Sequence, residues 1–137
     1  MRTIRTAGAL SALAIIAAVT ATPSHAQPAQ TVQAALSSEA GSLSEKFTGL
    51  ARVMAGKYEW KPGEGVRSAG DVFFLIVREN TLLAGTLSGA TPGRPAPITD
   101  PEKMQEALKT SYAKVQEAIA GLSDSDLKAP VKIFART

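Results

Sequence analysis

The sequence predicts an all-α fold, an up-down helical bundle with three main helices. Two segments carry apolar residues at alternating spacings of three and four, which is the period of one helix face. A third, strongly apolar segment lies between them and follows a typical capping sequence. Stretches rich in Gly and Pro separate the segments. The length of 137 residues fits one domain, and 45% apolar and 20% charged residues are typical of a folded protein.

The N-terminal segment has the pattern of a secretory signal peptide. Arg2 and Arg5 precede an apolar stretch from Ala7 to Val19, and Ser24-His25-Ala26 supplies the small residues that a signal peptidase reads. The apolar stretch is shorter than the roughly 20 residues that span a bilayer. We therefore expect cleavage of residues 1–26, no stable membrane anchor, and a periplasmic or secreted protein. Residues 27–31 are expected to form a flexible leader, and residues 32–137 the domain.

The mature chain is almost neutral and poor in reactive side chains. The full chain has 15 Lys and Arg against 12 Asp and Glu, and removal of Arg2 and Arg5 leaves 13 against 12, a net charge of +1. This charge gives no electrostatic preference for nucleic acid. The absence of Cys excludes disulfides, thiolate metal sites and a Cys nucleophile. The single His is His25, so the expected mature chain has no His for catalysis or metal binding.

The first helix is predicted from Val32 toward Gly56. One face carries apolar residues at spacings of 4, 4, 3, 4, 3 and 4, namely Val32, Leu36, Ala40, Leu43, Phe47, Leu50 and Met54. Gly41 lies inside this segment and marks a place where the helix can break. We expect Gly56 to cap the end of the helix.

A structured loop is predicted over residues 57–66, where several Gly and Pro residues surround two aromatic side chains. The favoured interpretation of Trp60 is a buried side chain that pins this loop to the bundle, and the alternative is stacking on a ligand. Ser68 and Asp71 then have the spacing of a variant capping box, in which both offer oxygens to free backbone N–H groups.

The second helix is predicted from Ala69 to Leu87. Its first part, residues 72–77, is apolar on all sides and also rich in strand-forming residues. The preceding cap and the pattern that continues through Leu83 and Leu87 favour a helix.

The third helix gives the clearest pattern in the chain. It follows a Gly- and Pro-rich connection from Gly89 to Pro97, with Asp100 as its cap and Pro101 in its first position. Its apolar face repeats at 4, 4, 3, 4 and 3, through Met104, Leu108, Tyr112, Val115, Ile119 and Leu122. Residues 123–126 are expected to begin a turn or short helix, and residues 131–134 to be extended or in a loop.

Two blocks carry a resemblance to a known family. Lys57-Tyr58-Glu59-Trp60-Lys61-Pro62 and the segment Arg67-Ser68-Ala69-Gly70-Asp71-Val72, with Asn80 further on, resemble the motifs of the DinB-like (YfiT-like) four-helix-bundle family, which is distinct from the DNA polymerase of that name. The resemblance covers about residues 31–137 and is most specific over residues 57–80.

The resemblance implies a metal site that this chain does not preserve. Family members use a divalent metal, usually held by three histidines, in reactions that include transfer and isomerisation with small thiols. Leu75 stands at the position of the first histidine, and the pair expected on the fourth helix is absent. We therefore expect no metal or other cofactor, a missing fourth helix, and an apolar groove left open between the other helices. A truncated gene product and a diverged bundle are both compatible with this pattern, and the first is favoured.

The candidate pocket or signature residues are Trp60, Arg67, Leu75, Glu79 and Asn80. Glu79 would be the best remaining general base if it faces a central pocket, but a surface position is the simpler interpretation, and Arg67 with Asp71 is more simply a local ion pair or cap. Three functions remain open. The favoured one is a non-catalytic binding or interaction module, which forms a homodimer or binds a protein partner through the groove. The others are a fragment of a metal-dependent thiol-transferase-type enzyme and a structural or chaperone-like helical protein.

Overall fold

A computed structural model describes residues 31–130 of the chain. These residues form α1 (Val32–Val53), α2 (Ala69–Ser88), α3 (Pro101–Ala120) and a short 3₁₀ helix, η1 (Asp126–Lys128), without any strand. The all-α class and the three main helices are therefore confirmed. The predicted signal peptide, most of the leader and residues 131–134 lie outside the described residues.

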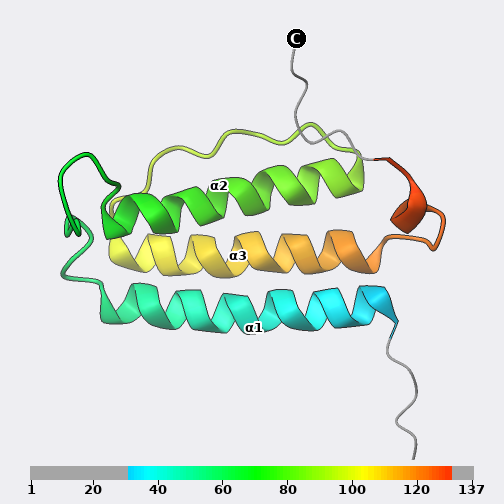
Figure 1. Ribbon diagram of the computed structural model, residues 1–137, viewed down its shortest axis with the longest axis horizontal. Helices are drawn as coiled ribbons and strands as arrows, with labels where there is room; N and C mark the ends of the chain where they lie inside the picture. The colour runs from blue at the N-terminus through cyan, green and yellow to red at the C-terminus, as the bar shows by residue number, and fades with distance from the viewer. Residues whose placement is uncertain (1–30, 131–137) are drawn as a thin grey trace, which may run out of the picture.

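The three helices lie side by side in one layer, with α3 in the middle (Figure 1). α1 and α2 both pack along α3 and scarcely touch each other. The predicted up-down order holds only for the first two helices, because α2 and α3 run in the same direction (Figure 1). The segment between them is long enough to explain this: the 12 residues from Gly89 to Asp100 can span about 40 Å, more than the roughly 30 Å length of α2.

α1 is one unbroken helix. Thr31 caps its start, where its Oγ1 accepts a hydrogen bond of 3.1 Å from the Ala34 N–H. The helix continues through Gly41 without a break. It ends at Val53 with Met54 in the C-cap position, and the prediction that Gly56 caps it was wrong. Met54 fills that role because its N–H bonds back to the Leu50 carbonyl at 3.0 Å.

The start of α2 confirms the predicted capping box. The Asp71 N–H donates to Ser68 Oγ and the Ser68 N–H donates to the Asp71 carboxylate, each at 3.1 Å. Residues 72–77 are helical, as the cap and the continuing pattern predicted. The helix ends at Gly89, whose φ of 70° places it in the left-handed region that Gly adopts without steric cost.

The loop before α2 is anchored by a tyrosine instead of the predicted tryptophan. Trp60 is 57% exposed, so the prediction of a buried Trp60 was wrong. Tyr58 is buried, its hydroxyl donates to the Ala51 carbonyl at 3.2 Å, and its ring lies 5.5 Å from that of Phe73. The Gly70 N–H bonds to the Tyr58 carbonyl at 2.9 Å, and a Cβ at Gly70 would lie only 3.1 Å from the Tyr58 Cβ. This close fit places Tyr58, and not Trp60, in the protein interior.

The connection from α2 to α3 packs against α2 at Gly85, where an added Cβ would lie 2.8 Å from the Pro92 Cβ. The connection leads into the predicted cap of α3: Asp100 accepts a hydrogen bond of 2.8 Å from the Lys103 N–H, and Pro101 follows as the first helical residue. Five of the six residues of the predicted α3 stripe are buried, namely Met104, Leu108, Tyr112, Val115 and Ile119. They form the centre of two adjoining core clusters.

Candidate functional site

α1 presents its small side chains to α3. Ala40, Thr48 and Ala51 are buried, and Gln116 on α3 donates a hydrogen bond of 3.0 Å from its Nε2 to the Ser37 carbonyl. A Cβ at Gly41 would lie 3.1 Å from that same Nε2 atom. Because small residues allow α1 to approach α3 closely, the larger apolar side chains of α1 lie to one side of this contact.

Those larger side chains lie along one side of α1, toward a hollow that Leu36 of α1 lines together with Leu83 and Leu87 of α2. Leu43 and Phe47 on α1 are partly buried and pack on the core clusters, whereas Leu36 and Leu50 are 47% and 50% exposed. We call this surface the apolar groove. It consists of this hollow and the apolar stripes beside it, which are Leu36, Leu43, Phe47 and Leu50 on α1 and Val72, Ile76, Leu83 and Leu87 on α2.

The α2 wall has the same mixture of anchored and exposed side chains. Ile76 and Leu87 pack on the core clusters. Val72 is 42% exposed and Leu83 is 37% exposed. Their spacing of four, seven and four residues along α2 keeps them on one side of the helix. α2 therefore offers solvent an apolar stripe that faces the same way as the stripe of α1.

The floor of the apolar groove belongs to α3. Tyr112, Val115 and Ile119 are buried between the two walls, and the ring of Phe47 stacks on that of Tyr112 with 6.3 Å between ring centroids. At the end of the groove near the start of α1, η1 closes a hollow of about 460 Å³. Its lining is almost wholly apolar and includes Leu36, Leu83, Leu87, Ile119, Leu122 and Leu127.

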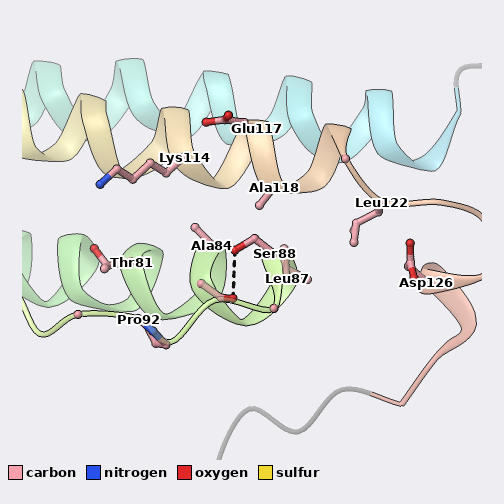
Figure 2. A pocket seen from close by; sticks show the side chains of 14 residues that line it. Thr81, Ala84, Leu87, Ser88, Pro92, Lys114, Glu117, Ala118, Leu122 and Asp126 are labelled. Carbon is pink, nitrogen blue, oxygen red and sulfur yellow. Dashed lines mark hydrogen bonds between the residues drawn. The ribbon is translucent and has the colours of Figure 1, made fainter.

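A second hollow, of about 750 Å³, lies between α2, α3 and the connection. Figure 2 shows Thr81, Ala84 and Ser88 of α2 along one wall and Lys114 and Ala118 of α3 along the other. The Ser88 hydroxyl is bonded to the Gly85 carbonyl at 3.2 Å. Lys114 and Glu117 are exposed, so this hollow is open and does not gather buried reactive groups.

The five residues predicted from the sequence do not meet at one site. Trp60 and Arg67 are exposed in the loop before α2. Leu75 is half-buried on α2, and Glu79 is exposed beside a shallow hollow that Arg78 and Arg94 also line. Asn80 points to α3 instead, where its Nδ2 donates to Ser111 Oγ at 3.1 Å. Glu79 and Asn80 therefore face different surfaces of α2 although they are adjacent in the sequence.

Local hydrogen bonds lower the pKa values of two carboxyl groups. The pKa of Asp71 is lowered mainly by the Ser68 backbone N–H and then by the Ser68 hydroxyl, with smaller contributions from Lys61 and Arg67. The pKa of Asp126 is lowered in the same way by the Ser123 hydroxyl and backbone N–H. The Asp71 carboxylate closes the capping box of α2, and the Asp126 carboxylate closes a turn with Ser123, so both lowered pKa values reflect these local hydrogen bonds.

Two tyrosines are affected chiefly by burial. Burial raises the pKa of the Tyr58 hydroxyl, and the negative charge of Asp100 raises it further. Burial also raises the pKa of Tyr112, against a smaller opposing effect of Asn80. Both hydroxyls therefore stay protonated at neutral pH and act as structural groups.

Within residues 31–130, no three His, Cys, Asp or Glu side chains are placed to hold a metal ion together. No helix in this part of the chain combines the length and apolarity needed to cross a membrane. No protein-family model matches the chain, and no curated protein or solved structure matches it either.

The apolar groove was partly visible in the sequence. The sequence predicts the stripe of α1 and an apolar α2 whose pattern continues through Leu83 and Leu87, and the family resemblance implies an open groove between helices. The pattern did not show that the α1 stripe lies beside its contact with α3, because Ser37, Gly41 and Thr48 give no strong apolar signal.

Proposed function

We propose that this chain is an exported, non-catalytic interaction module of DinB-like type, which binds another protein through the apolar groove. The observation that carries the proposal is the pair of apolar stripes on α1 and α2, which flank one face of a single helical layer. Contiguous apolar surface of this kind on a small domain is characteristic of an association site.

The DinB-like type is supported by the local chemistry of the blocks that carry the resemblance. Tyr58 and Gly70 fit against each other, and Ser68 with Asp71 forms the capping box. Each of these residues belongs to the quoted motifs and has a defined structural role here. A fourth helix, absent from residues 31–130, would be expected to cover the apolar groove in a complete bundle.

The proposal of a non-catalytic role rests on the side chains themselves. Leu75 replaces a metal ligand with a group that has no lone pair to donate, and Glu79 lies away from Asn80 and from the groove floor. The described residues also contain no His or Cys that would supply a nucleophile or a general base near neutral pH.

Binding of an environment-sensitive apolar dye to the purified full chain at high dilution tests the groove. We expect bound dye to fluoresce, and we expect Leu83→Asp to reduce that signal several-fold because it places a charge in the α2 wall. Val53→Asp is the matched control, because Val53 is 81% exposed and lies outside both stripes. Equal dye binding in all three proteins, or none in the wild type, would overturn the groove proposal.

The non-catalytic part has its own test. Thiol-transfer activity is measured with glutathione, an electrophilic substrate and added divalent metal, in the full chain and in Glu79→Gln. We expect no turnover above the protein-free rate in either. Turnover that disappears in Glu79→Gln would overturn the non-catalytic assignment.

A further inference from the structure

We infer that the occupant of the apolar groove is a second copy of this chain, related to the first by a two-fold axis parallel to the helices. This inference rests on the proposed function, because it names the partner of the same groove. In this arrangement α1 of each copy lies over α2 of the other. The two α3 helices, which form the groove floors, face each other between these two pairs of helices. The contact is closed and symmetric, as in most soluble homo-oligomers.

The size of the face fits such a contact. Each helix of 20 to 22 residues is about 30 Å long, and three helices spaced about 8–10 Å apart make a face about 25 Å wide. The face therefore has a projected area of roughly 750 Å², which is large enough for a standard protein interface, in which each partner buries ~800 Å² of accessible surface. Most of its large side chains are apolar, which is typical of the centre of a homodimer interface.

The positions of Lys46 and Glu79 favour a second copy as the partner and define its orientation. Hydrogen bonds set each helix against α3: Ser37 lies level with Gln116, Arg52 with Gln105, and Asn80 with Ser111. Counting along α1 from the first two pairs places Lys46 level with about residue 109 of α3. Counting from Asn80 places Glu79 level with residue 110. Lys46 and Glu79 therefore stand at the same height on opposite outer edges of the groove.

A two-fold axis parallel to the helices keeps every residue at its own height and exchanges the α1 and α2 sides. It therefore brings Lys46 of one copy beside Glu79 of the second copy, and does so twice. Both side chains are exposed in the single chain. A two-fold axis across the helices would instead place the two Glu79 side chains near each other at mid-height, where like charges repel. The charges thus favour the first arrangement.

The apolar side chains of the two walls also lie opposite each other in this arrangement. By the same counting, Leu50 of one copy lies over Ile76 of the other, about one helical turn from Val72, and Leu36 lies over the region of Leu83 and Leu87. These apolar side chains cover one another, and each copy supplies a second layer over residues 31–130 of the other. η1 remains at the end of the groove, where it borders the hollow beside Leu36.

Sedimentation velocity of the full chain over a wide concentration range tests the inference, and we expect a monomer–dimer equilibrium. Leu83→Asp should raise the dissociation constant by about a hundredfold or more, because each dimer contains the change twice. Val53→Asp should leave the dissociation constant unchanged. A dimer that persists in Leu83→Asp would overturn the inference, because its interface would then lie elsewhere.

A charge swap tests the orientation. Lys46→Glu should weaken the dimer roughly tenfold, because two attractive pairs become repulsive. The double variant Lys46→Glu with Glu79→Lys should recover the wild-type dissociation constant, since each copy then carries the exchanged pair. A double variant that is as weak as the single one would overturn this arrangement.

The two proposals fail in different ways. A chain that is monomeric at every concentration but binds the apolar dye through Leu83 overturns the second copy and leaves the groove proposal intact. A chain that is monomeric and binds no dye overturns both. Loss of the dye signal as the dimer forms supports both, because the dimer covers the surface that the dye occupies.

Discussion

The contacts of α3 with α2 and with α1 use different kinds of side chain. Against α2 it packs large apolar side chains, with Phe73 and Val77 meeting Met104 and Leu108 in one cluster. Against α1 it meets small side chains such as Ala40 and Ala51 together with the ring of Phe47, and hydrogen bonds from Gln116 and between Arg52 and Gln105 also join the two helices. α3 is therefore joined to α2 mainly by apolar burial, and to α1 by apolar burial, close approach and hydrogen bonds together.

This difference explains why the chain has an apolar groove. α2 uses its first aromatic residue, Phe73, for the contact with α3, whereas α1 stacks Phe47 on Tyr112 but leaves Leu36 and Leu50 47% and 50% exposed. The amphipathic stripe of α1 is only partly used within the chain. A helix that buries its small side and leaves its large side half-covered is suited to a further partner.

The largest expected effect is on the α2 contact. Phe73→Ala should lower the free energy of unfolding by about 3–5 kcal/mol, because Phe73 is 3% exposed and its removal leaves a cavity beside Tyr58. Leu50→Ala on the α1 stripe should cost about 1 kcal/mol or less in dilute protein. Urea denaturation measures both. Equal losses would show that the α1 stripe is as fully buried as the α2 contact.

A stabilising change is expected in the α1 contact. Thr48 is buried and its Oγ1 has no hydrogen-bond partner within residues 31–130. Thr48→Val keeps the shape and removes the unpaired hydroxyl, so it should raise the free energy of unfolding by about 1 kcal/mol. Thr110→Val, on the exposed side of α3, is the control and should change it by about 0.5 kcal/mol or less. A loss of stability in Thr48→Val would mean that a water or ligand satisfies the hydroxyl.

The hydrogen bond between α3 and α1 gives a smaller effect. Gln116→Ala removes the bond to the Ser37 carbonyl and should cost about 0.5–1.5 kcal/mol. In that background Gly41→Ala should recover up to about 1 kcal/mol, because Ala favours helix and the crowding amide is gone. Thermal unfolding of the two variants checks both steps. A further loss in the double variant would show that α1 approaches α3 through other atoms at Gly41.

The smallest effect is expected at the capping box and depends on pH. The pKa of Asp71 lies below its usual value of 3.8, because Ser68 stabilises the carboxylate. The stabilisation is therefore fully present above that value and is lost as pH falls through the lower pKa of the folded protein. Unfolding midpoints of the wild type and of Asp71→Asn should differ at neutral pH and converge in strong acid. A difference that stays constant with pH would exclude this linkage.

Several features of the fold could be predicted because they depend on neighbouring residues. The caps at Ser68 and Asp100 are short-range hydrogen bonds, and the α3 stripe is a repeat along one helix. The choice between Tyr58 and Trp60 could not be predicted in the same way. Both are aromatic residues in one loop, and only the close approach of Gly70 and the position of the Ala51 carbonyl select Tyr58 for the interior.

The sequence by itself determined where the helices begin and which stripes are apolar, because caps and periodicity act within a few residues along the chain. Only the tertiary structure decided how those stripes are used. The connection returns along α2 and makes α2 and α3 parallel (Figure 1), and Gly41 allows α1 to approach Gln116 of α3 closely. These outcomes depend on contacts between residues far apart in the chain, which periodicity along one helix does not encode.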